Sequence, residues 1–335
     1  MSSTPPVPPS TAWERFWFTP ADPVGLHAVR VAAGVLFLAW LLPLVGHRNA
    51  LFGLTGWFDR QAFAAAAALP DGPPKPLGWS AAYLGGGGPE AVTAVYATAI
   101  VATALFTLGV WPRLTGVLTW VAVASFTANP AVDVDADAVL MVLAFYLMVG
   151  YVLLGQRSAG RSWSARLLGG RHSGPSVGAG IALRLLQVHL AVLIVTSGLH
   201  KLQFGDWWAG VALWYPLYPP LYTTLDQARA HVRQPEQYLM QLNVAAYATL
   251  AWQIGFPLFA WRRTGWWAVV GGAVVGWVGV AVVYGMSLYG AALFVGCLAF
   301  VPPAVWRQLS EHVARFRPGQ GRVGGQSPAL SGGAK

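Results

Sequence analysis

The sequence predicts an all-α fold: a polytopic membrane bundle of about eight transmembrane helices. Of its 335 residues, 56% are hydrophobic and only 10% are charged, whereas an average soluble domain carries about 25% charged residues. The mean hydropathy is +0.52, the chain contains 17 Trp, and long runs without any charge recur along it. A soluble protein could not bury this much apolar surface, because charged residues would have to cover its outside.

A helix that crosses a membrane needs about 20 mostly apolar residues, so the runs between charges mark the expected spans. These spans are 26–46, 91–112, 114–132, 138–156, 181–203 and 237–261, followed by two within 264–306. The last run contains no charge and is too long for one helix, so we divide it near Gly285. The spans form one expected domain over 20–306, between a disordered and interfacial N-terminal tail at 1–19 and a basic cytoplasmic tail at 307–335.

Loop charges set the expected orientation, because Lys and Arg are enriched in cytoplasmic loops. If the N-terminus is inside, fifteen Lys and Arg residues fall inside and six outside, while nine of the twelve acidic residues fall outside. We therefore expect a multi-pass protein of the cell (plasma or inner) membrane, surrounded by the lipid bilayer, with both termini cytoplasmic. The net charge of +9 then reports topology, and no nucleic-acid partner is expected.

The end of the fifth expected span departs most from a simple membrane helix. Lys201 ends this span, His200 precedes it, and Asp206, Trp207 and Trp208 follow. Ionisable side chains at membrane depth are costly and usually face a bundle interior or a water-filled cavity. A desolvated Lys201 there could serve as a general base. Alternatively, Lys201 extends to the lipid headgroups and the two Trp side chains belong to an aromatic belt.

Other polar residues of the spans favour a pocket near this lysine. Ser197 lies one helical turn before Lys201, and His189 lies eleven residues before His200, which returns it to the same helical face. Arg30, in the first expected span, has two interpretations: its side chain reaches the cytoplasmic surface, or it makes an interior ion pair or binds an anionic ligand.

Three aspartates, Asp133, Asp135 and Asp137, alternate just before the fourth expected span. The stretch DVDADAV opens like a calcium loop but lacks that loop's Gly and Glu, so we expect helix capping. The alternative is a site shared with Lys201, since both segments face the expected outer side. The single cysteine, Cys297, and the absence of an HExxH motif predict no metal site.

The segment SGLHKLQFGDWWAGVALW resembles the horizontally transferred transmembrane domain family, whose best-known member is the vitamin K-dependent gamma-carboxylase. That family carries a helix ending in Gly-x-x-Lys-Leu, followed by Asp-Trp and a Gly. The matching positions here are Gly198, Lys201, Leu202, Asp206, Trp207 and Gly210. Two weaker similarities are to the family's first helix and to its Asn-Pro…Asp segment, at Arg30, Gly34, Asn129, Pro130 and Asp137.

The resemblance implies that Lys201 acts as a base toward a reduced isoprenoid quinone of the vitamin K type, whose oxygenation yields a strong base for glutamate carboxylation. The implied catalytic residues are Lys201, His200 and Asp206. The implied quinone pocket comprises Arg30, Asn129, Asp137, His189, Ser197, Trp207 and Trp208.

The sequence also departs from the carboxylase. No His follows Asn129, none lies between His231 and His312, and the chain ends in the basic tail, so we expect no large outer domain. The function therefore stays open between a quinol-linked, carboxylase- or oxidoreductase-like enzyme and a non-catalytic carrier or assembly partner that retains the fold.

Overall fold

The computed structural model describes residues 11–68, 79–83, 85–129, 132, 135–154, 174–219, 223–224, 226–227, 230 and 235–315. Within these ranges the regular elements are helices, with one isolated bridge between Ala21 and Ser176, which confirms the all-α class. Five segments are long and apolar enough to cross a membrane, and a sixth is added if a bent helix pair counts as one span. The five are Val24–Phe52, Pro89–Leu108, Asp137–Leu154, Val177–Lys201 and Trp266–Tyr284.

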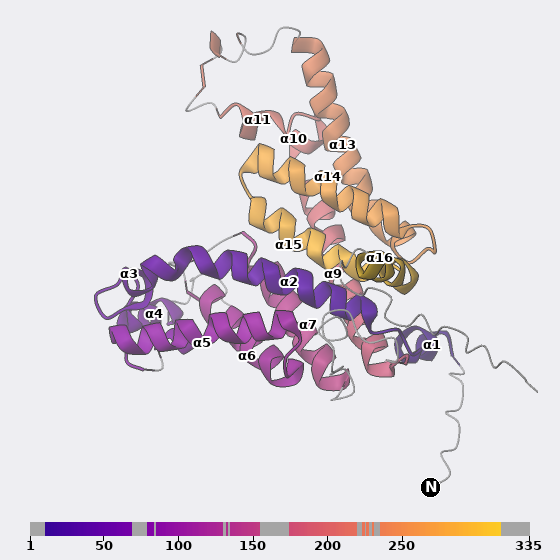
Figure 1. The fold of residues 1–335 in the computed structure, drawn as a ribbon. Coiled ribbons are helices and arrows are strands. Elements are labelled where there is room, and N and C mark those ends of the chain that lie inside the picture. Colours follow the sequence, from indigo (N-terminus) through magenta and orange to yellow (C-terminus); the bar gives the residue numbers. More distant parts are fainter. Residues whose placement is uncertain are drawn as a thin grey trace, which may run out of the picture.

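The first half of the chain builds the main helical layer (Figure 1). It consists of α2 (Val24–Leu41), α5 (Pro89–Leu108), α6 (Pro112–Thr127), α7 (Asp137–Leu154) and the start of α9 (Val177–Lys201). Each of these helices packs against the next one along the chain. Their facing side chains form one continuous apolar core, which also receives α15 (Ser287–Cys297).

A glycine sets the distance between the first two helices of this layer. A Cβ atom on Gly34 of α2 would lie 2.0 Å from Oγ1 of Thr107 on α5. Thr107 in turn donates its hydroxyl to the carbonyl of Thr103 (2.7 Å). The two backbones can approach this closely only because position 34 has no side chain.

The second half of the chain extends away from the main helical layer. It consists of α13 (Pro235–Ala260), α14 (Trp266–Tyr284), α15, the short η5 (Leu298–Phe300) and α16 (Pro303–Arg315). In Figure 1, α13 and α14 rise above the main layer, whereas α15 returns to it. The chain then bends by 104° between the α15–η5 segment and α16. The predicted break near Gly285 is confirmed, since α14 ends at Tyr284 and α15 begins at Ser287.

The expected count of about eight spans is not confirmed. The helix α6 has 16 residues, which gives about 24 Å of length against a hydrocarbon core of about 30 Å. The helix α13 has 26 residues but carries the polar side chains of Gln241, Asn243 and Gln253 and an internal Pro257. The helix α15 has 11 residues and reaches a span's length only together with its bent continuation.

Short elements surround the helix ends. At one end, α1 (Ala12–Phe18) begins with a capping box between Thr11 and Glu14. Its Phe16 ring lies 6.4 Å from that of Trp261, so α1 packs beside the end of α13. The opposite helix ends carry η1 (Leu42–His47), α3 (Arg48–Phe52), α4 (Arg60–Ala67), η2 (Ala81–Tyr83), α10 (Gly205–Trp208) and α11 (Trp214–Leu217).

Candidate functional site

The centre of the candidate site is the amine of Lys201, the last residue of α9. Its side chain is half-buried. The Nζ atom donates to Oγ of Ser197 (2.8 Å) and to the carbonyl of Ser197 (3.4 Å). It also lies 5.5 Å from the centroid of the Trp207 ring. Neither partner is negatively charged, so the lysine is held by a hydroxyl group and an aromatic face rather than by an ion pair.

The Trp207 ring reaches this position because the chain turns sharply after α9. One turn of helix, α10, begins at Gly205 and places Trp207 inward and Trp208 outward. Trp207 joins a small apolar cluster with Ala212, Ala246 and Leu250. Trp208 is exposed, and its Nε1 donates to the carbonyl of Leu202 (2.7 Å). Trp207 thus forms a wall of the lysine site, whereas Trp208 lies on the outer surface.

The other two predicted catalytic residues do not contact the amine. His200 is exposed, and its ring packs against Phe204 at 5.1 Å between centroids. Asp206 is exposed as well, and within the described residues it makes no ion pair with Lys201. The structure therefore brings together Lys201, Ser197 and Trp207, and leaves His200 and Asp206 at the surface beside them.

His189 lies apart from this group. Its Nδ1 atom is 2.9 Å from the hydroxyl of Tyr146 on α7. Twelve residues of helix separate His189 from Lys201, or about 18 Å at 1.5 Å per residue. His189 and Lys201 are therefore too far apart to line one pocket, contrary to the prediction. His189 instead connects α9 with α7 through its contact with Tyr146.

Arg30 belongs to the interior of the main layer. Its side chain is only 1% exposed, its NH1 donates to the Tyr151 hydroxyl (3.1 Å), and its guanidinium lies 5.3 Å from the centre of that ring. The Tyr151 hydroxyl is also 2.5 Å from Nδ1 of His27. Arg30 can only donate, so the Tyr151 oxygen accepts its hydrogen bond. Sequence reasoning missed His27 and Tyr151, although His27 lies one turn before Arg30 on α2 and shares its face.

Asn129 and Asp137 take structural positions at the end of the bundle where α7 begins. Asn129 is buried, and its Nδ2 donates to the Tyr83 hydroxyl (2.6 Å), which donates to the Phe58 carbonyl (2.5 Å). Burial raises the pKa of Tyr83 to about 12, so the hydroxyl keeps its proton and this bond at neutral pH. Asp137 is the first residue of α7, where a carboxylate interacts favourably with the helix dipole. Asp133 lies outside the described residues.

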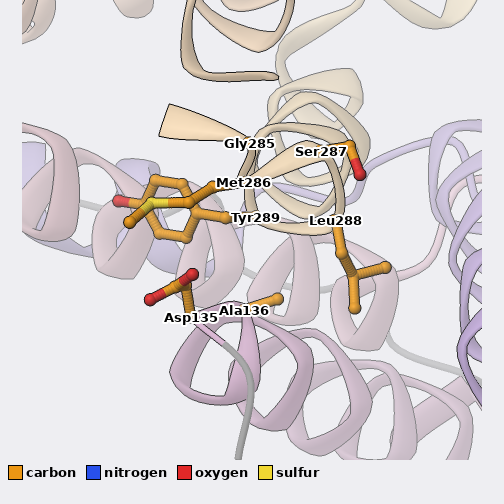
Figure 2. A pocket seen from close by; sticks show the side chains of 7 residues that line it. All are labelled: Asp135, Ala136, Gly285, Met286, Ser287, Leu288 and Tyr289. Atoms are coloured by element: carbon orange, nitrogen blue, oxygen red, sulfur yellow. The ribbon is translucent and has the colours of Figure 1, made fainter. Parts of the chain in front are cut away.

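A cavity of about 350 Å³ lies near this end of α7, beside the turn between α14 and α15 (Figure 2). It is lined by Asp135, Ala136, Gly285, Met286, Ser287, Leu288 and Tyr289. Sequence reasoning singled out Asp135 and the break at Gly285 separately but not their proximity. Across the described ranges, no group of three or more His, Cys, Asp or Glu side chains could hold a metal ion.

Comparisons of the chain with family models, with curated proteins and with solved structures found no match. The fold and composition define an integral membrane protein of helical type.

Proposed function

We propose that this membrane protein is a quinol-linked enzyme in which Lys201 is the general base. The observation that carries the proposal is the environment of the Lys201 amine: half-buried, hydrogen-bonded to Ser197, and placed against Trp207. A lysine that only anchors a helix end extends its ammonium into the headgroups. The amine of Lys201 instead folds back one turn along its own helix.

The residues around the amine fit a reduced quinone. A bound quinol would supply an acidic hydroxyl group and an aromatic ring. The Nζ atom of Lys201 would take the hydroxyl proton, with Ser197 Oγ holding the amine in place. Trp207 and the apolar cluster behind it would exclude water from this side. The amine is only half-buried, so its proton would leave to solvent without passing through the His200 ring.

The proposed site contains fewer residues than the site predicted from the sequence. Its members are Lys201, Ser197 and Trp207, with His200 and Asp206 at its exposed edge. Arg30, Asp137 and His189 contact other parts of the bundle and would act on the site only through the packing of α2, α7 and α9. Asn129, which follows α6 and bonds to Tyr83, would act only through the loops at the end of the bundle.

The test is the substitution Lys201→Arg. Arginine keeps a positive charge at every physiological pH and cannot act as a base, yet it reaches the headgroups as well as lysine does. We expect the variant to insert and fold normally but to lose the base-dependent oxidation of a reduced menaquinone analogue by dissolved dioxygen, which accepts the two electrons, followed by absorbance. Mass spectrometry of organic extracts should find an isoprenoid quinone bound to the wild-type protein.

Arg48→Lys is the matched control, because Arg48 is a cation at the same end of the bundle, bonded to Thr93 and Val45. It should leave both readouts unchanged. If Lys201→Arg equals the wild type in both, Lys201 is an anchor and the catalytic proposal is wrong.

A second candidate, a non-catalytic assembly partner, is favoured by the exposed face of α14. Val275 and Val282 are more than 70% exposed and Val278 is 57% exposed. A photocrosslinking residue at position 278 shows whether this face of α14 contacts another protein or lipid. Protein adducts, combined with a wild-type protein free of quinone, would favour the assembly partner. Lipid adducts would remove the only structural observation that favours it.

The eight-span topology with cytoplasmic termini is part of the proposal. Helix ends expected inside do meet: Ala21 pairs with Ser176, and Arg307 forms an ion pair with Asp22 (2.5 Å). Reporter fusions after positions 171 and 263 should report the cytoplasm, and those near positions 135 and 226 the outside. Opposite results at two of these points would contradict the topology.

A further inference from the structure

The cavity between α7 and the α14–α15 turn is separate from the lysine site. The residues that line it come from two short stretches, 135–136 and 285–289. Gly285 caps α14 with φ +73°, a left-handed conformation that favours glycine. This turn directs the Met286 and Tyr289 side chains toward the start of α7 (Figure 2). The cavity is thus a product of the turn and not a gap between loosely packed helices.

Among the described residues that line the cavity, Asp135 carries the one negative charge. Asp135 is exposed, and within the described residues its carboxylate makes no hydrogen bond or ion pair. None of the described residues that line the cavity is Lys, Arg or His. An anionic ligand such as a phosphate would therefore meet repulsion, whereas a cation would gain a direct electrostatic attraction.

The cavity wall beside the Asp135 carboxylate is formed by a thioether and an aromatic ring. In Figure 2 the Asp135 carboxylate lies beside the Tyr289 ring and the Met286 thioether, and Ala136 follows Asp135. Leu288 also lines the cavity. Aromatic faces attract ammonium groups through the ring quadrupole, most strongly where water is partly excluded. A divalent metal ion would find one carboxylate here, whereas calcium takes six to eight oxygen ligands.

We propose that this cavity binds a small organic cation, a primary or quaternary ammonium. Its volume of about 350 Å³ falls at the lower end of small-molecule sites, which suits an ammonium group with a short apolar body. Asp135 supplies the counter-charge, and Tyr289 and Met286 contact the alkyl groups. The same chemistry is present in a free amine and in the ethanolamine or choline headgroup of a lipid.

The first test compares two probes on the wild-type protein in detergent. Choline and its uncharged carbon isostere 3,3-dimethylbutan-1-ol have nearly the same shape, so calorimetric titration isolates the contribution of the charge. We expect choline to bind about tenfold more tightly or better. Because this comparison needs no substitution, it stays decisive even if a variant fails to fold.

The second test uses matched variants. Asp135→Asn should lower the choline affinity about tenfold, since it removes the counter-charge at constant size. Tyr289→Phe keeps the ring and should stay within about twofold. Glu90→Gln is the control, because Glu90 is another exposed carboxylate at this end of the bundle, and it should bind choline as the wild type does.

A bilayer arm separates the two sources of the ligand. Native mass spectrometry of protein from nanodiscs that contain phosphatidylglycerol with or without phosphatidylcholine measures bound lipid. Retention of phosphatidylcholine that Asp135→Asn abolishes identifies a headgroup, whereas binding of free choline alone identifies a soluble amine. If neither form shows Asp135-dependent binding, or if choline binds no better than its isostere, the proposal is wrong.

Discussion

The spans that begin with α2 and α14 have almost the same mean hydropathy but differ widely in how much of each is buried inside the protein. The best window of the span that begins with α2 has a mean hydropathy of 2.1 and that of α14 has 1.9, yet 50% of the first and 11% of the second lies buried. Both sequences predict a membrane helix with equal strength. Only one of them forms the centre of a bundle.

The difference shows that hydropathy cannot distinguish a helix buried in protein from a helix exposed to lipid. Lipid tails are as apolar as a leucine-rich protein interior, so an apolar residue gains nothing by choosing one over the other. A polar residue does discriminate, because in hydrocarbon it needs a partner. The helix α2 carries Arg30 and His27, which find Tyr151, whereas α14 carries no charged residue.

The largest expected effect concerns close packing. Gly34→Leu should destabilise the protein by about 3 kcal/mol or more, because its Cβ alone would overlap the Thr107 hydroxyl and helices α2 and α5 would have to separate. The free energy of unfolding, measured by SDS titration in mixed micelles, checks this.

Gly276→Leu on α14 makes the same substitution where nothing lies within 4 Å of a new Cβ. It should leave stability unchanged or raise it by up to about 1 kcal/mol through helix propensity. A large loss at position 276 would break the comparison, since it would place a partner against α14.

A smaller effect is expected at the buried cation. Arg30→Lys should cost about 2 kcal/mol, because the ammonium cannot reproduce the planar donor geometry toward Tyr151. The same titration measures it. Arg113→Lys serves as the control: Arg113 is exposed and donates to the Val152 carbonyl at 3.2 Å, so a change within about 0.5 kcal/mol is expected. Equal stability of both variants would show that Tyr151 does not hold Arg30.

The smallest effect concerns the connection between α13 and α14. Trp252 donates its Nε1 proton to the carbonyl of Ala268 (3.1 Å), and this ring also fills the space beside Gly272. Trp252→Phe removes the donor and should cost about 1 kcal/mol. Trp267→Phe, at a position 64% exposed on α14, should cost nothing measurable. Similar losses in both variants would mean that the outer face of α14 is also packed.

The sequence by itself determined the helical membrane class of the protein and the approximate positions of its long apolar helices. The run after 264 carries no charge but is longer than one span needs, so it had to break, and the break lies near Gly285. Arg113 marks the boundary between α5 and α6 only approximately, because the turn lies at 109–111 and Arg113 belongs to the first turn of α6. Local spacing also determined part of the lysine site. Ser197 and Lys201 are four residues apart on one helix, and this spacing alone brings hydroxyl and amine together.

Tertiary structure decided everything that depends on residues distant in the chain. The partner of Arg30 lies 121 positions away, so no local pattern could choose between the interior and the headgroups for its side chain. The helix turn after Lys201 sent Trp207 inward and left Asp206 exposed, although both follow the lysine closely. The cavity at Asp135 exists only because two segments about 150 residues apart meet, and hydropathy, which is additive along the chain, carries no information about such meetings.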